Sequence, residues 1–91
     1  MNKCMDVDAV TLRLRRIEGQ VRGIIKMIEE DKECEDLLIQ IGSAKAALHK
    51  TGQVILEGHM HHCFLDGVRE GNADEAIKKL SAAIEQFSRI V

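Results

Sequence analysis

Apolar residues recur along the first third of the chain at alternating intervals of four and three residues. They are Val10, Leu14, Ile17, Val21, Ile24 and Ile28. This spacing is typical of an amphipathic helix with a coiled-coil-like seam. Asp6 and Asp8 are both suitable amino-terminal caps, so the pattern predicts a helix from one of these residues to about Asp31.

The rest of the chain predicts two further helices. The polar segment DKEC ends the first helix, and a second is predicted from about Glu33 to near Phe64. Its middle, GSAKAALHKTG, is rich in small residues, which are tolerated best where two backbones approach closely. After the turn EGNADEA, Asn72 or Asp74 can cap a third helix. Its apolar stripe is formed by Ile77, Leu80, Ile84, Phe87 and Ile90. The chain is therefore expected to be a single all-α domain, residues 1–91, with three helices.

Composition places this domain in the cytoplasm and predicts that it oligomerises. A chain of 91 residues has a marginal core, and with only Phe64 and Phe87 as aromatic residues that core is aliphatic. Assembly into oligomers is expected to supply the missing buried area. The three cysteines, Cys4, Cys34 and Cys63, follow nothing that resembles a signal peptide, which indicates free thiols in a reducing compartment. No apolar run approaches the roughly 20 residues of a membrane helix, so we expect a soluble protein with no membrane partner.

Charge is distributed unevenly along the chain, although the net charge is only −2. Residues 13–22 hold four arginines against one glutamate, whereas residues 29–36 hold six acidic residues against one lysine. A local basic stripe matters more for DNA binding than the net charge does. The alternative is a solvated helix face. The candidate DNA-binding residues are Arg13, Arg15, Arg16 and Arg22, joined by Lys45 and Lys50.

Candidate metal ligands fall on one stripe of the second predicted helix. His59 and Cys63 are four residues apart and so lie one helical turn apart on the same face. At 100° per residue Cys34 shares this stripe, but about 37 Å of helix separates it from His59. Two copies of the helix packed antiparallel would place Cys34 of one chain beside His59 and Cys63 of the other, giving two equivalent sites.

Two thiolates and one imidazole favour Cu(I), because soft ligands at low coordination number suit that ion. Zinc usually takes a fourth ligand. The chain offers Cys4, His61, His62 or water for that position, so zinc and nickel stay open. The alternative for the cysteines is a packing role, since a buried free cysteine is often a small apolar filler.

The segments RLRRIEGQVRGIIKMIEEDKEC, DLLIQIGSAKAAL and LEGHMHHC closely resemble the copper-sensitive operon repressor family. The resemblance extends from about Val10 to Gln86. It implies an all-helical cytoplasmic repressor that forms an antiparallel dimer, a four-helix bundle, and then a dimer of dimers. It also implies that the inducer releases the protein from operator DNA. The Cys, His, Cys triad of the copper members falls on Cys34, His59 and Cys63, with one Cu(I) expected per chain.

The chain also departs from the pattern of the family it resembles. Copper members carry a tyrosine and a glutamate near the metal, whereas this chain has no tyrosine and has Lys79 near the glutamate's position. Glu75, one turn earlier, is a candidate substitute. Cys4 and His62 are further candidates close to the metal.

Other functions stay open at this point. Nickel-sensing relatives add an amino-terminal histidine that this chain lacks, and persulfide-sensing relatives lack the histidine that matches His59. A metal carrier or storage protein would use the same triad but would not need the arginine stripe. An enzyme with a cysteine nucleophile is disfavoured, because the sequence shows no oxyanion donors or aromatic lining, and no small-molecule substrate is expected.

Overall fold

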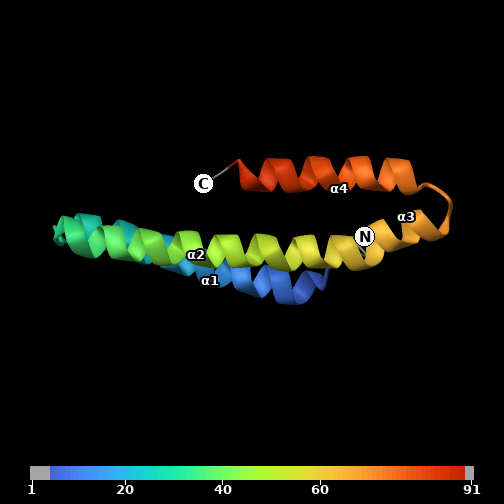
Figure 1. Ribbon diagram of the computed structural model, residues 1–91. Helices are drawn as coiled ribbons and strands as arrows, with labels where there is room; N and C mark the ends of the chain where they lie inside the picture. Colours follow the sequence, from blue (N-terminus) through green and yellow to red (C-terminus); the bar gives the residue numbers. More distant parts are fainter. Residues whose placement is uncertain (1–4, 90–91) are drawn as a thin grey trace. The chain divides into compact units, whose positions relative to one another are not determined.

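One continuous helical stretch runs from Cys34 to Arg69 and changes its hydrogen-bonding period along the way. The computed structural model describes residues 5–89, without the side chains of Cys63 and Phe64, and this part is helical with no strand. The elements are α1 (Val7–Glu29), α2 (Cys34–Gly58), the π-helix η1 (His59–Phe64), α3 (Leu65–Arg69) and α4 (Ala73–Ser88) (Figure 1). Because α2, η1 and α3 follow without an intervening turn, the all-α prediction with three helical stretches is confirmed. The second stretch ends five residues later than predicted.

The chain divides into two compact units, and the first comprises Asp8–Thr51. It is a hairpin of α1 and the first part of α2 (Figure 1). Asp31 sits in the left-handed region at φ 57°. Two hydrogen bonds close the end of α1 around this residue, from the Asp31 amide to the Ile28 carbonyl (3.1 Å) and from the Lys32 amide to the Met27 carbonyl (3.0 Å). This pattern is a Schellman motif, which ends α1 and reverses the chain.

The buried residues of the hairpin follow a spacing of seven on each helix. Val10 and Ile17 of α1 are buried, as are Ala44 and Thr51 of α2. The Thr51 hydroxyl donates a hydrogen bond to the Ala47 carbonyl (2.8 Å), so this buried polar group is satisfied. Buried and exposed residues therefore alternate along the predicted seam of α1: Val10 and Ile17 are buried, whereas Leu14 and Val21 are exposed.

The second unit contains residues 5–7 and 52–89 of the described chain. After α3, Gly71 at φ 84° accepts the left-handed conformation that ends the helix, and the Asn72 amide donates to the Gly67 carbonyl (2.8 Å). The chain then reverses, and α4 contacts both η1 and α3. Asn72 precedes α4 as predicted, but its side chain makes no capping hydrogen bond.

Large apolar side chains remain exposed on all the long helices of this single chain. On α1 these include Leu14, Val21 and Ile28, which are alternate positions of the predicted seam. On α2 they are Leu38, Ile39, Ile41 and Leu48, and on α4 they are Ile77 and Ile84. Each helix thus leaves a large part of its apolar surface uncovered within the chain. Ile90 of the predicted α4 stripe lies outside the described residues.

Candidate metal centre and nucleic-acid interface

Cys34 is the first residue of α2, and its thiol is free and exposed. Glu33 stands just before it, and the Glu33 carbonyl accepts a hydrogen bond from the Leu37 amide (3.1 Å), which starts the helix. Cys34 is therefore fixed in position by a regular helix start while its sulfur stays accessible to a ligand.

His59 follows the last residue of α2 and opens the π-helix η1. The π-helix is a rare conformation that occurs mostly as single turns, frequently at functional sites. The His59 side chain is half-buried, and it lines a cavity of about 400 Å³ with Met5, Gly52, Ile55, Leu56, Ala83 and Phe87. Cys63 belongs to the same π-helix, but its side chain is outside the described part of the chain.

The described side chains bring no three His, Cys, Asp or Glu residues together as a metal-binding group within one chain. Cys34 and His59 belong to opposite ends of α2, one at its first residue and one just after its last. The full length of α2 thus separates the two residues within one chain. Cys4, a candidate fourth ligand, lies outside the described residues.

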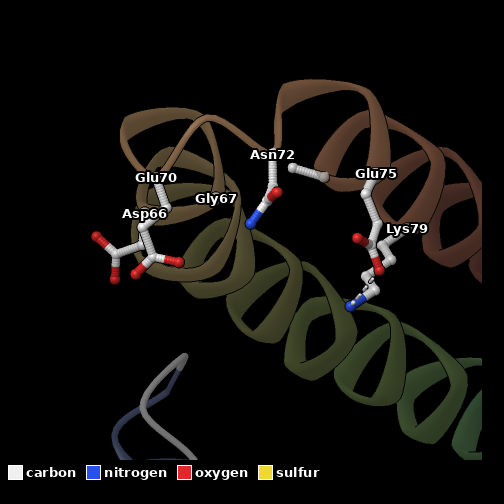
Figure 2. A pocket seen from close by; sticks show the side chains of 7 residues that line it. Asp66, Gly67, Glu70, Asn72, Glu75 and Lys79 are labelled. Atoms are coloured by element: carbon white, nitrogen blue, oxygen red, sulfur yellow. Dashed lines mark ion pairs between the residues drawn. The ribbon is translucent and has the colours of Figure 1, made fainter.

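The other histidines of the cluster and Glu75 do not line the cavity beside His59. The side chains of His61 and His62 are exposed on η1. Glu75 forms an ion pair with Lys79 (3.5 Å) and lines a different cavity, together with Asp66 and Glu70 (Figure 2). Glu75, the candidate substitute for the glutamate of the copper members, is thus ion-paired with Lys79, the residue that stands near that glutamate's position. A role for Glu75 or His62 beside the metal stays a prediction.

The predicted basic residues all lie in the hairpin unit, on α1 and on the first part of α2. The side chains of Arg13, Arg15, Arg16, Arg22, Lys45 and Lys50 are all exposed. The hairpin turn, by contrast, carries the acidic run of residues 29–36. Guanidinium groups on a regular helix can neutralise successive phosphates, so α1 offers the chemistry of a nucleic-acid interface.

Comparison with known proteins assigns the family. Residues 6–86 match the family described as "Metal-sensitive transcriptional repressor". The chain belongs to this family. Metal-sensitive repressors are regulators of transcription and not enzymes, so the family membership confirms the repressor interpretation and excludes the cysteine-nucleophile alternative.

The chain is similar to copper-sensing repressors and to a nickel-responsive regulator. The copper-sensing transcriptional repressor CsoR of Bacillus subtilis (strain 168) is 43% identical over 82 residues, which cover 90% of this chain and 81% of that protein. The crystal structure of the copper-sensing repressor CsoR with Cu(I) from Geobacillus thermodenitrificans NG80-2 superposes with a TM-score of 0.85 at 41% identity, covering 90% and 85% of the two chains. The nickel-responsive transcriptional regulator InrS also gives a TM-score of 0.85, at 31% identity and with 96% and 97% covered. No helix of this metal-sensitive repressor, within the described residues, is long and apolar enough to cross a membrane.

Sequence reasoning missed three features of this region. It did not predict the π-helix at His59–Phe64, the place of Met5 in the cavity with His59, or the close seating of α4 on glycines. Gly52 and Gly67 were the available signals, because a glycine within a helical pattern marks a close approach of another segment.

Proposed function

We propose that this metal-sensitive repressor binds operator DNA in its metal-free form and that Cu(I) releases it from the DNA. Two thiols and one imidazole at the ends of α2 and in η1 carry the proposal, because this soft donor set suits Cu(I). The names of its relatives support it, since both the Bacillus repressor and the Geobacillus structure are described as copper-sensing. The controlled genes are then genes of copper efflux or buffering, and the protein acts in the reducing cytoplasm.

In the proposed site, each Cu(I) is held by Cys34 of one chain and by His59 and Cys63 of the other, with one ion per chain. The accessible thiol of Cys34 and its separation from His59 by the whole of α2 support a site shared between two chains. Apart from Met5, the side chains that line the cavity with His59 offer no atom that binds a metal ion. When bound, Cu(I) links the two chains through their thiolates and the imidazole.

The proposed assembly is an antiparallel dimer that pairs into a dimer of dimers. Uncovered apolar positions support it: Leu14, Val21 and Ile28 recur every seven residues on α1. Leu38, Ile41 and Leu48 provide a second apolar row on α2. Two hairpins that bury these rows against each other form a four-helix bundle, and the bundle brings the beginning of one α2 beside the end of the other.

Operator DNA is contacted, in this proposal, by α1 and α2 of the hairpin unit. The exposed arginines of α1 and Lys45 and Lys50 of α2 neutralise phosphates, and a symmetric oligomer repeats these contacts several times. Sequence preference comes from a few base contacts and from DNA shape.

Metal binding and DNA binding are coupled in this proposal because both use residues of α2. Cys34 and His59 stand at the two ends of α2, and α2 also carries Lys45 and Lys50. Fixing Cys34 against His59 of the other chain sets the offset between the two α2 helices, and this offset determines the spacing of the basic faces. By reciprocity, DNA weakens metal binding by the same factor by which the metal weakens DNA binding.

A nickel-responsive repressor is the second candidate, because InrS covers almost the whole chain with an equal TM-score. Its lower sequence identity, 31% against 41% for the copper-sensing structure, favours copper. Persulfide sensing has no such support from the relatives named above, and metal storage leaves the exposed arginines without a role.

The deciding experiment is an anaerobic fluorescence-anisotropy titration of the metal-free protein on DNA from its own promoter. Cu(I), Ni(II), Zn(II) and an inorganic polysulfide are added separately at matched equivalents. We expect that Cu(I) alone releases the DNA, at about one ion per chain, and that the Cys34→Ala variant binds DNA but is not released. Release by Ni(II) or polysulfide without release by Cu(I) would assign a different inducer, and a metal-free protein that does not bind DNA would favour storage.

A further inference from the structure

The cavity beside His59 holds one further atom that can bind a soft metal ion. Of its seven lining residues, Gly52, Ile55, Leu56, Ala83 and Phe87 offer only carbon and hydrogen from their side chains. The two exceptions are the imidazole of His59 and the thioether of Met5. Both side chains are half-buried, so the thioether sulfur and the imidazole share a small space, about 400 Å³, with apolar walls.

The backbone places Met5 with the ligand-bearing unit and not with the basic hairpin. Residues 5–7 group with residues 52–89, whereas α1 from Asp8 onward groups with the first part of α2. Met5 lies in a bend two residues before α1 begins at Val7. Met5 therefore belongs to the same compact unit as His59, although nearly the whole of α1 belongs to the other unit.

The chemistry of a thioether distinguishes between metals. A methionine sulfur is a soft, polarisable ligand of the kind that selects Cu(I), whereas Ni(II) is suited by imidazole nitrogen. A thioether is also uncharged and costs little to bury, unlike a carboxylate in the same cavity. A packing role alone is the competing interpretation, because methionine commonly fills irregular apolar gaps.

We propose that Met5 contributes its thioether to the copper site from the same chain as His59 and thereby raises the selectivity of the site for Cu(I). This inference rests on the proposed function and deepens it. Met5 thereby adds a soft, uncharged sulfur donor to Cys34 of the second chain and to His59 and Cys63.

The test replaces Met5 by leucine, which keeps the apolar volume and removes the sulfur. Met27→Leu is the matched control, because Met27 is a half-buried methionine of α1 that does not line the cavity. Cu(I) affinity is measured anaerobically by competition with a chromophoric Cu(I) chelator, and Ni(II) affinity by competition with a second chelator. We expect Met5→Leu to lower Cu(I) affinity by at least about tenfold, because even the loss of a group that only supports a ligand typically costs a metal site about 10–100-fold. Ni(II) affinity, Cu(I) stoichiometry and the melting temperature of the metal-free protein should stay as in the wild type.

Copper X-ray absorption gives an independent readout, in which the Met5→Leu protein should show one sulfur neighbour fewer than the wild type. Unchanged Cu(I) affinity in Met5→Leu, or an equal decrease for both metals, would overturn the proposal and leave Met5 a packing residue. A decrease of Cu(I) affinity in Cys4→Ser but not in Met5→Leu would also overturn it, because the neighbouring thiol would then be the donor. If the wild-type protein binds no Cu(I), the proposed function fails together with this inference, whereas wild-type binding that Met5→Leu leaves intact overturns the inference alone.

Discussion

The aromatic ring of Phe87 on α4 lies directly against the backbone of Gly52 on α2, so closely that a β-carbon at Gly52 would overlap the ring. A similar close approach occurs near the other end of α4, where a β-carbon at Gly67 would lie 2.9 Å from the β-carbon of Ala76. In sequence, Gly52 precedes η1 and Gly67 follows it. The helix α4 is therefore seated on two glycines on either side of the π-helix that carries His59.

We predict that Gly52→Ala destabilises the packing of α4 against α2. Overpacking costs about 1–3 kcal/mol, and the overlap of the added methyl group with the Phe87 ring places this substitution in the upper part of that range. This cost exceeds the roughly 1 kcal/mol that alanine gains over glycine in a helix. Thermal unfolding should show a lower melting temperature, and hydrogen exchange should speed up in residues 73–88. Gly23→Ala is the control, because a β-carbon there meets nothing within 4 Å, and it should raise the free energy of unfolding by about 0.5–1 kcal/mol. Equal effects of the two substitutions would contradict the close approach of Phe87 to Gly52.

A second prediction concerns the turn between α1 and α2. Asp31 is a non-glycine residue at φ 57°, and its negative charge stands at the carboxyl end of α1, where the helix dipole disfavours it. Asp31→Gly should raise the free energy of unfolding by about 0.5–1 kcal/mol, measured by urea denaturation. Asp31→Ala removes the charge but keeps the β-carbon, so it separates the two causes. If alanine stabilises as much as glycine does, backbone strain is not the reason.

A third prediction separates DNA binding from metal binding. Arg15→Ala and Arg16→Ala each remove an exposed guanidinium from α1 and should weaken operator binding, while Cu(I) affinity stays nearly unchanged. The slope of log affinity against log salt concentration should fall by about one for each phosphate that the variant no longer neutralises. Arg69→Ala is the control, because Arg69 is also an exposed arginine but lies on α3, 4.0 Å from Asp66. Failure of the Arg15 or Arg16 variant to bind Cu(I) would show that the two functions are not separate.

A fourth prediction tests whether the metal site is shared between chains. Cys34→Ala alone and the double variant His59→Ala/Cys63→Ala should each bind no Cu(I) tightly. When the two proteins are unfolded together and refolded, mixed dimers bring the intact Cys34 of one chain to the intact His59 and Cys63 of the other. Tight Cu(I) binding should return at about one ion per mixed dimer, measured by chelator competition after the mixed dimers are isolated with two different affinity tags. No recovery in correctly folded mixed dimers would place all the ligands of a site within one chain.

The sequence by itself determined the helices and most of their ends. Apolar residues at intervals of three and four predict α1 and α4 because only one face of each helix can be buried, and the DKEC break precedes the start of α2 at Cys34. The exposure of the arginines could also be predicted, since charged side chains off the apolar seam have no reason to be buried. The common stripe of Cys34 and His59 follows from helical geometry alone, which also excludes their meeting along one straight helix.

Only the tertiary structure decided which part of each apolar stripe the chain covers itself. Val10 and Ile17 are buried while Leu14 and Val21, on the same seam, are exposed, and the sequence pattern is identical for both sets. The structure likewise decided that α4 seats Phe87 on Gly52 and that Met5 joins His59 in one cavity. These relationships join residues far apart in the sequence, and they depend on how side chains of particular sizes fit together. Periodicity fixes the direction of a side chain around its own helix but not the partner that the side chain meets.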